Sequence, residues 1–248
     1  LLPGRYLIWQ DGKLEIHRYW KPEFHPDESK TLEDWADEIH NTLKEIMPEV
    51  KTADERVESF LSGGVDSSYV LAMSDAEQAD CCGYEEERFD ESVLAEKTAQ
   101  LLGRKFSRSI ITPEQFFDIV PYVMYNMEQP LGDASAIVFT LGCNATAEHT
   151  KICYSGEGSD EFFGGYNMYR NAERYGENLK NFYVGNTNIM KEDEKQKILK
   201  KYDPDVLPIE LARGIYEETE GLDPLTKMSD VDIQIWLEGD IYLNVDKM

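Results

Sequence analysis

The sequence predicts an α/β fold in which a parallel sheet carries helices on both faces. A β-hairpin precedes this sheet and a mainly helical part follows it. Strand-like, loop and helix-like segments alternate between residues 57 and 155, which is the pattern of parallel strands joined by crossover helices. The apolar period changes to three and four residues after Thr31, as in amphipathic helices, and no strand pattern recurs beyond Ser159.

The N-terminal hairpin is predicted from two β-rich runs, 5–9 and 14–20, on either side of an Asp11-Gly12 turn. Two prolines in 21–30 mark that stretch as a connector. Because a lone hairpin is only marginally stable in water, we expect it to belong to the sheet of an absent upstream domain or to pack on the next part of the chain. The expected domains are therefore 1–30, hairpin and connector, and 31–248.

The remaining elements are predicted from periodicity, caps and chain breakers. Thr31 begins a helix with a capping-box pattern, Gly103 ends another, and Thr112 with Pro113 begins a third. The expected strands are 57–61, 79–83, 106–111 and 151–155. The expected helices are 31–47, 67–73, 90–102, one from 112, 134–148 and 231–245, with further helical pieces starting at Asp203-Pro204 and Leu207-Pro208.

The charge balance excludes two classes of partner. Asp and Glu number 49 against 25 Lys and Arg, which gives a net charge of −24. Nucleic acids and anionic membranes need a positive surface, so we expect neither as a partner. No apolar run approaches the ~18 residues of a membrane helix. The four cysteines, 81, 82, 143 and 153, have no zinc or C-x-x-C spacing, which predicts reduced, partly buried thiols in a cytoplasmic protein.

A glycine- and serine-rich loop comes after the strand expected at 57–61. Its glycines leave backbone N–H groups uncovered, its serines add hydroxyl donors, and the positive end of the next helix points into it. This predicts a phosphate-binding loop, but not the P-loop of kinases and GTPases, because no Gly-Lys-Ser/Thr follows the glycines. Asp66 would repel phosphate unless a cation lay between them, so Mg²⁺ is implied. The loop residues are Leu61, Ser62, Gly63, Gly64, Val65, Asp66, Ser67 and Ser68.

A second loop, after the strand expected at 151–155, is rich in carboxylates. Ser155 and Gly156 close that strand at the edge of the sheet where ligands of open α/β folds lie. Three acidic residues come next within five positions: Glu157, Asp160 and Glu161. A solvated acidic turn is the alternative to a functional role, and it stays open for Glu161.

The two loops carry a resemblance to a known family. Residues 62–67 resemble the signature of the ATP pyrophosphatases, enzymes of PP-loop type that cleave ATP between its α and β phosphates. Residues 155–166 are similar to the second signature of the glutamine-hydrolysing asparagine synthetase family. Shorter shared pieces lie in the same order at 2–4, 18–20, 89–92 and 128–135, and the resemblance is looser after Tyr166. The implied fold is that of the adenine nucleotide alpha hydrolases.

The resemblance implies a role for individual residues. It places Leu61, Cys82 and Gly83 around the adenosine, mostly through their backbone, and residues 62–68 with Ser155 and Gly156 around the phosphates. Asp66 and Asp160 would hold Mg²⁺, and Glu157 would accept a proton from the attacking amine or orient it. Asp133, Ser135 and Glu161 are candidate contacts to the amino-acid substrate. A helix N-cap explains Asp133 equally well, and a core position explains the Cys82 side chain.

The implied reaction has two steps. MgATP adenylates the β-carboxylate of aspartate and releases pyrophosphate, and ammonia then displaces AMP to leave asparagine. The resemblance further implies a glutaminase domain before residue 1, which supplies the ammonia from glutamine. It also implies a segment beyond Met248 that supplies a lysine and an Arg-x-Pro-Phe-Leu-Asp stretch. A homodimer is one expected assembly.

Three alternatives remain beside this interpretation. A ligase with the same fold can activate another carboxylate, as β-lactam synthetases and lasso-peptide cyclases do. A tRNA-modifying pyrophosphatase would need a basic RNA-binding face and reactive paired cysteines, against which the charge of −24 speaks. A non-catalytic ATP-binding module is the third, and the presence of Asp66, Glu157 and Asp160 argues against it.

Overall fold

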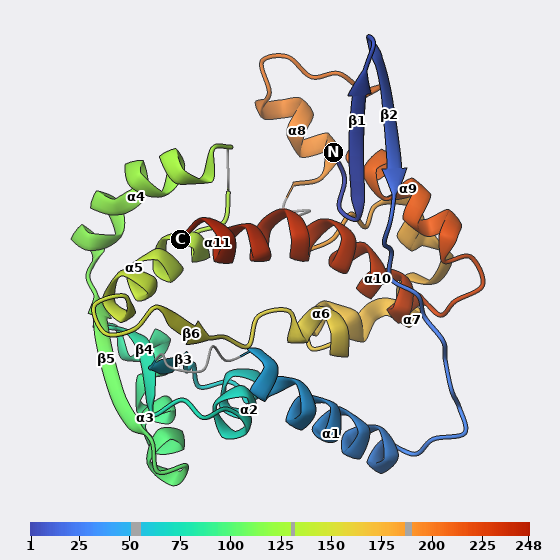
Figure 1. The fold of residues 1–248 in the computed structure, drawn as a ribbon. Helices are drawn as coiled ribbons and strands as arrows, with labels where there is room; N and C mark the ends of the chain where they lie inside the picture. Colours follow the sequence, from blue (N-terminus) through green and yellow to red (C-terminus); the bar gives the residue numbers. More distant parts are fainter. Residues whose placement is uncertain (51–55, 130–131, 187–189) are drawn as a thin grey trace. The chain divides into compact units, whose positions relative to one another are not determined.

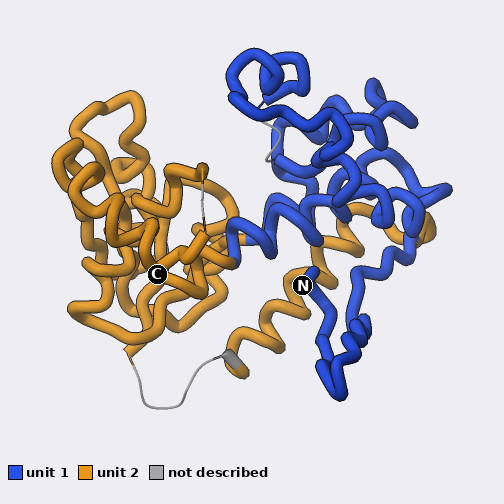
Figure 2. The backbone as a smooth tube through the Cα atoms, turned by 90° about the horizontal axis from the view of Figure 1, so that it is seen from above, with its two compact units in different colours: residues 1–26, 158–242 blue, residues 27–157, 243–248 orange. Residues whose placement is uncertain are grey.

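The computed structural model describes residues 1–50, 56–129, 132–186 and 190–248. The chain forms two compact units, each built from two separate stretches (Figure 2). We call Asp27–Glu157 with Leu243–Met248 the sheet unit, and Leu1–Pro26 with Gly158–Tyr242 the helical unit. The division into domains 1–30 and 31–248 stays a prediction.

The sheet unit contains the predicted parallel sheet (Figure 1). Its strands are β3 (Val57–Phe60), β4 (Gln78–Tyr84), β5 (Lys105–Ile111) and β6 (Ile152–Tyr154), in the order β5-β4-β3-β6. β3 lies between β4 and β6, with Ser59 opposite both Ala79 and Tyr154. The strands therefore end at one common edge, where the loops after β3, β4 and β6 emerge.

Helices cover both faces of this sheet, as predicted. One face packs Val57, Ala79 and Tyr154 against buried residues of the helices that follow β3 and β4, chiefly Leu71 and Ala95. Burial of these apolar side chains is the main contribution to stability here. The helical elements of the unit are α1 (Leu32–Val50), α2 (Val65–Met73), η1 (Glu87–Phe89), α3 (Ser92–Leu101), α4 (Pro113–Met127), α5 (Ser135–Thr146) and all but the first residue of α11 (Tyr242–Lys247).

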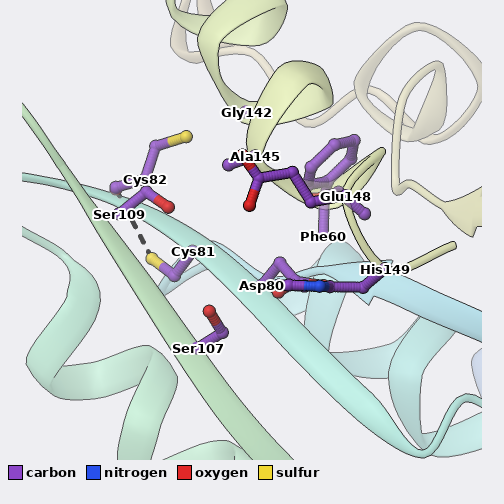
Figure 3. A pocket seen from close by; sticks show the side chains of 11 residues that line it. Phe60, Asp80, Cys81, Cys82, Ser107, Ser109, Gly142, Ala145, Glu148 and His149 are labelled. Atoms are coloured by element: carbon purple, nitrogen blue, oxygen red, sulfur yellow. Dashed lines mark hydrogen bonds between the residues drawn. The ribbon is translucent and has the colours of Figure 1, made fainter.

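The opposite face of the sheet lies under α5 and is unusually polar. Phe60 and Phe139 pack there with ring centroids 5.5 Å apart, yet Glu58 is fully buried and Asp80 is 8% exposed. Arg56 Nη2 lies 2.7 Å from Glu58 Oε1. A cavity of about 140 Å³ between α5 and the sheet is lined by Asp80, Cys82 and His149, among others (Figure 3). Two carboxyls thus share one buried, largely uncompensated environment.

Helix α4 has a well-defined start and packs on α5. Thr112 and Gln115 form a complete capping box at the start of α4, where Pro113 is the first helical residue. Val123 and Met127 of α4 pack on α5, and Leu243 and Met248 from the end of the chain pack against the same cluster. The C-terminal stretch is therefore part of the hydrophobic core of the sheet unit.

The helical unit begins with the predicted hairpin, β1 (Arg5–Gln10) and β2 (Lys13–Arg18). Asp11 and Gly12 both have positive φ, 51° and 75°, as a type I′ hairpin turn requires. No strand occurs in the described residues beyond Gly158, as expected. The remaining elements are α6 (Ser159–Phe163), η2 (Asn167–Asn171), α7 (Ala172–Tyr175), η3 (Gly176–Asn181), α8 (Glu192–Ile198), α9 (Ile209–Glu218), α10 (Pro224–Val231) and η4 (Asp232–Ile241).

Two details of the helical unit differ from expectation. Asp203-Pro204 begins no helix but a turn, whereas the helical piece expected from Leu207-Pro208 is present as α9, with Pro208 as its N-cap. The helical stretch predicted for 231–245 is present, but η4 within it is a π-helix. Wide helical turns of this kind are rare, and the apolar period of the sequence does not distinguish them from α-helix.

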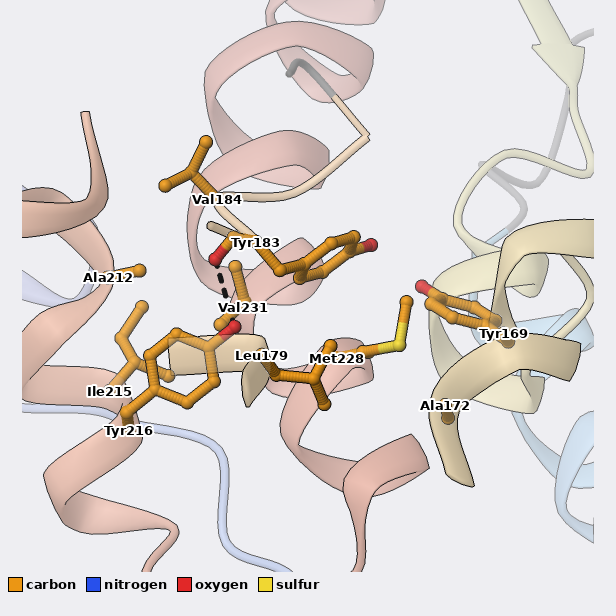
Figure 4. Close-up of a cluster of buried hydrophobic side chains, with 10 residues drawn as sticks. All are labelled: Tyr169, Ala172, Leu179, Tyr183, Val184, Ala212, Ile215, Tyr216, Met228 and Val231. Carbon is orange, nitrogen blue, oxygen red and sulfur yellow. Dashed lines mark hydrogen bonds between the residues drawn. The ribbon is translucent and has the colours of Figure 1, made fainter. Parts of the chain in front are cut away.

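The helical unit has its own core, formed by ten buried side chains of which three are tyrosines (Figure 4). Tyr216 donates a hydrogen bond to the backbone oxygen of Tyr183 at 2.9 Å. The hydroxyls of Tyr169 and Tyr183 both donate to the fully buried Asp232 carboxylate. Burial raises the pKa of Asp232 to about 6. None of the helices in the described part of the chain is both long and apolar enough to cross a membrane.

The buried pair on the polar sheet face predicts a pH-dependent stability. Burial, followed by the hydrogen bond and charge of Asp80, raises the pKa of Glu58 to about 7. The folded state then binds a proton more tightly than the unfolded state, so stability is greatest below pH 4.5 for this group and falls as the pH rises through 7. Glutamine has no proton to lose, so in Glu58→Gln we expect the decrease in unfolding free energy with rising pH to be smaller by on the order of 1–3 kcal/mol.

Urea denaturation at pH 5, 6, 7 and 8 measures the effect. The difference in unfolding free energy between wild type and Glu58→Gln should grow in favour of the variant as the pH rises. Glu114→Gln, an exposed carboxylate in α4, is the matched control and should keep the wild-type slope. Equal pH slopes for wild type and Glu58→Gln would contradict the assignment.

Candidate nucleotide site

The loop after β3 is held in shape by its own serines. The backbone N–H of Ser62 donates to Ser67 Oγ at 3.1 Å, and the two hydroxyls lie 2.9 Å apart. The N–H of Gly64 donates to Ser62 Oγ at 3.1 Å, while Ser68 Oγ donates to the Gly64 carbonyl at 2.7 Å. These hydrogen bonds within the predicted phosphate loop fix the shape of its backbone.

The helix after this loop, α2, presents its N-terminus at the same edge of the sheet. Gly64 is the N-cap, and no side chain caps the helix. The first N–H groups of a helix have no acceptor within it, and together with the helix dipole they favour an anion. Val65 and Asp66, in the first turn, are both exposed. This arrangement fits the phosphate role expected for residues 62–68.

Gly156 brings the second loop directly onto the first. A Cβ built on Gly156 would lie 2.9 Å from the Ser67 backbone nitrogen and 3.1 Å from the Asp66 carbonyl carbon. Only a glycine allows this approach of the two backbones. The structure thus brings Ser155, Gly156 and Glu157 of the second signature to the first turn of α2, with Glu157 exposed. This contact within the sheet unit unites the two sequence motifs in one site.

The end of β4 forms a third side of the site. Leu61 extends the pairing of β3 with β4, because its N–H donates to the Asp80 carbonyl at 2.9 Å. The Cys82 side chain faces α5, with its sulfur 3.9 Å from the Val138 carbonyl oxygen, and burial raises the pKa of that thiol to about 11. The side chain of Cys82 is half-buried and lines the cavity under α5, and the adenosine contact of its backbone stays a prediction.

The segment 89–92 contributes contacts that the sequence did not predict. Arg108 Nη2 lies 2.6 Å from Asp90 Oδ2, and the Ser92 N–H donates to Asp90 Oδ1 at 3.1 Å. The N–H of Gly63 donates to Glu91 Oε2 at 3.3 Å. The sequence predicted Asp90 as the cap of the helix 90–102; its carboxylate does accept from the first N–H of α3, although the N-cap position is Glu91. No sequence signal predicted the contacts with Arg108 and Gly63.

The acidic residues of the second signature fall in different units. Glu157 ends the first stretch of the sheet unit, whereas Asp160 belongs to α6 in the helical unit. A Cβ on Gly165 would overlap Asp160 Oδ1, so only a glycine at this position leaves room for the carboxylate. Gly158 and Gly164 cap α6 with φ of 92° and 70°. The glycines of this signature therefore shape the short helix that carries Asp160.

Glu161 is placed differently from its acidic neighbours. It is 1% exposed, and Tyr166 donates its hydroxyl to Glu161 Oε1 at 2.7 Å. Burial raises the pKa of this carboxyl. Glu161 is thus not a solvated acidic turn, and its contact with the amino-acid substrate stays a prediction.

The segment 128–135 contains a cap and an ion pair. Asp133 Oδ1 accepts from the Ser135 N–H at 2.9 Å and its other oxygen from the Ser135 hydroxyl. The N-cap of α5 is Ala134, so Asp133 lies one residue before the cap position predicted for it. Its substrate role, like that of Ser135, stays a prediction. Lys247 Nζ lies 2.8 Å from Glu128 Oε2, and this charge pair lowers the pKa of Glu128. Residues 130–131 of the segment lie outside the described residues.

The donor set is compatible with Mg²⁺. Across the four described ranges, no group of three or more His, Cys, Asp or Glu side chains forms a metal-binding cluster. Mg²⁺ usually needs only one or two protein carboxylates, because phosphates and water supply its other ligands. An exposed Asp66 carboxylate in the first turn of α2, next to a phosphate loop, meets that requirement.

The contact at Gly156 is directly testable. Gly156→Ala should lower the unfolding free energy by about 1–3 kcal/mol, since the added methyl overlaps backbone rather than a movable side chain. It should also weaken nucleotide binding, because the loops must separate. Chemical denaturation measures the first effect and titration with MgATP the second. Gly214→Ala, where nothing lies within 4 Å of the new Cβ, should not destabilise; an unchanged Gly156→Ala protein would refute the close approach.

Comparison with known proteins agrees with the two signatures. The profile of the Asparagine synthase family matches residues 38–248. The glutamine-hydrolyzing asparagine synthetase 1 of Bacillus subtilis (strain 168) is 30% identical over 288 residues, covering 99% of this chain and 45% of the relative. Glutamine-hydrolyzing asparagine synthetase B of Escherichia coli (strain K12) is 27% identical, covering 68% and 34%. The chain thus spans less than half the length of these relatives.

Among solved structures, a glutamine-dependent NAD⁺ synthetase from Acinetobacter baumannii in complex with ADP is similar over 88% of this chain and 46% of that chain. Its TM-score is 0.39 and its identity 16%, a level that supports no assignment of function. The family match covers most of the chain. The chain therefore belongs to the asparagine synthase family.

Proposed function

We propose that this chain is the ATP-dependent synthetase part of a glutamine-dependent asparagine synthetase. The observation that carries the proposal is the contact of Gly156 with the first turn of α2, which unites both signatures at one edge of the sheet. Open α/β folds bind their ligands at that edge. The family membership and the names of the relatives support aspartate as the substrate.

In the first proposed step, an oxygen of the aspartate β-carboxylate attacks the α-phosphorus of ATP. The bond between that phosphorus and the bridging oxygen breaks, and pyrophosphate leaves with the electron pair. The loop 62–68 and the N-terminus of α2 stabilise the charge that grows on the pyrophosphate. When bound, Mg²⁺ would neutralise part of this charge, and Asp66 with Asp160 are the residues we propose to hold it.

In the second step, ammonia attacks the activated carbonyl carbon and AMP leaves. The nitrogen gains a positive charge as the new bond forms, so one proton must be removed. Glu157, exposed beside Gly156, is the proposed acceptor of this proton. The ammonia is proposed to come from glutamine through a glutaminase domain of the natural protein.

ATP–pyrophosphate exchange, with the natural protein at full length and Mg²⁺ present, tests this function. Exchange that depends on aspartate would demonstrate reversible aspartyl-adenylate formation. Exchange with another carboxylate in place of aspartate would support the proposed adenylation and contradict aspartate as the substrate. No exchange with any acid, despite bound ATP, would reject the enzyme in favour of a binding module.

Glu157→Gln should separate the two steps. The amide cannot accept a proton, so ammonia-dependent asparagine formation should fall by about 10²–10⁴, while aspartate-dependent exchange persists. Both rates are measured on the same preparation. Glu114→Gln, which changes an exposed carboxylate of α4 in the same way, is the control. A parallel loss of both rates would show that Glu157 acts before or during adenylation instead.

Asp66→Asn and Asp160→Asn should each lower the exchange rate, by on the order of 100-fold or more, because each removes a proposed metal ligand. The Mg²⁺ concentration needed for half-maximal exchange should rise in both variants. Asp118→Asn, an exposed residue of α4, should leave rate and Mg²⁺ dependence unchanged. An unaltered Mg²⁺ dependence in both variants would remove these residues from the metal site.

A further inference from the structure

The segment at the start of α3 is shared with the family, yet the proposed reaction gives it no task. Asp90 and Glu91 stand there side by side and contact two different parts of the candidate site. Glu91 accepts a hydrogen bond from the phosphate loop, and Asp90 pairs with Arg108 beside the end of β4. The two contacts lead to opposite ends of the place where the nucleotide is proposed to lie.

We infer that Asp90 and Glu91 are positioning residues of the nucleotide site: Glu91 fixes the phosphate loop, and Asp90 with Arg108 fixes the strand end that meets the nucleoside. This inference rests on the proposed function, because it assumes that ATP occupies the site. It assigns different parts of the site to two adjacent carboxylates, and each acts through backbone that the ligand is proposed to touch.

Glu91 acts on the phosphate loop through Gly63. The N–H of Gly63 donates to Glu91 Oε2 at 3.3 Å. A Cβ on Gly63 would lie 3.3 Å from Glu91 Cβ and 3.1 Å from Leu94 Cδ2, so the loop rests against the first turn of α3. Gly63 is one of the two loop residues with the greatest conformational freedom, and its backbone is therefore held by a residue outside the loop. A loop ordered in advance loses less entropy when phosphate binds.

Asp90 acts on the nucleoside end of the site through Gly83. A Cβ there would lie 2.9 Å from Asp90 Oδ1 and 2.8 Å from Arg108 Nε, so the ion pair lies against the bare backbone at the end of β4. The Asp90 side chain is only 7% exposed, and Arg108 holds its other oxygen at 2.6 Å. The pair also forms part of the wall of an open cavity of about 830 Å³, next to Tyr84.

Stability alone does not account for this arrangement. The Asp90 side chain is buried, but the Arg108 side chain is 40% exposed, so solvent screens the attraction between the two charges and limits what the pair contributes to folding. Glu91 is exposed and adds a negative charge beside a loop that is to receive phosphate, which is unfavourable unless its hydrogen bond serves the loop. The geometry thus favours positioning over simple structural support.

Two variants of Glu91 separate positioning from competition. Glu91→Ala removes the acceptor for the Gly63 N–H, whereas Glu91→Gln keeps an acceptor and removes the charge. Calorimetric titration of the full-length protein with MgATP, Mg-pyrophosphate and adenosine should show Glu91→Ala weakening the first two by about fivefold, the usual effect of one hydrogen bond. Adenosine binding should stay unchanged, and Glu91→Gln should remain within twofold of wild type.

Tighter pyrophosphate binding by both Glu91 variants would overturn this part, because it would show that the carboxylate competes with phosphate. Unchanged binding by Glu91→Ala would overturn it as well. Glu96→Ala removes an exposed carboxylate from the same helix and should match wild type with all three ligands. Thermal unfolding of each variant separates loss of ligand affinity from loss of fold.

Asp90→Asn and Arg108→Met test the other end. Asparagine keeps an acceptor for the Ser92 N–H, so Asp90→Asn removes chiefly the ion pair. Each variant should bind adenosine and MgATP severalfold more weakly than wild type and bind Mg-pyrophosphate with unchanged affinity. The double variant should bind no more weakly than either single variant, since both lose the same interaction. Equal weakening of adenosine and pyrophosphate would reduce the pair to a structural role. Wild type that binds no MgATP would reject the proposed function itself.

Discussion

The approach of Gly156 to the backbone of Asp66 and Ser67 is the constraint on which the candidate site depends. It arises from the sheet, because β3 and β6 are parallel neighbours whose ends stand at the same height, with Ser59 opposite Tyr154. Each strand delivers its loop to one edge, and the absence of a side chain lets the two loops touch. The backbone of the first loop and that of the second signature thereby meet at Gly156.

The acidic composition of the chain extends into its interior. Glu58 and Asp80 occupy the sheet face under α5, and Asp232 lies within the core of the helical unit. Their surroundings differ: Asp232 accepts two tyrosine hydroxyls and a backbone N–H, whereas Glu58 has the exposed Arg56 and a second carboxyl. Buried charge costs free energy unless partners compensate it. Burial raises the pKa of both Asp232 and Glu58, but only the Asp232 carboxylate is stabilised by a set of hydrogen-bond donors.

Local signals in the sequence were enough for most of the fold. Period-two runs, the Asp11-Gly12 turn and the cap at Thr112 act over a few residues, and the structure confirms the elements that they predict. The contacts of Glu91 with Gly63 and of Lys247 with Glu128 join positions 28 and 119 residues apart, and nothing local marks them. The sequence did not predict that η4 is a π-helix for another reason: its wide turns depend on packing rather than on the apolar period. Carboxylates are rarely fully buried, so core residues predicted from the apolar pattern do not include Glu58.

The interleaved order of the units has a consequence for synthesis. The sheet unit is nearly complete once Glu157 has been made, but Leu243 and Met248, which pack on the cluster of α4 and α5, are made 85 or more residues later. The hairpin of the helical unit is in the opposite position, since it is made before the sheet unit and packs with residues after 157. Domains generally fold as units during synthesis, N-terminal first. Here the helical unit needs residues up to Tyr242 and the sheet unit needs Leu243–Met248, so a ribosome that stalls before Leu243 would leave apolar surface open on α4 and α5.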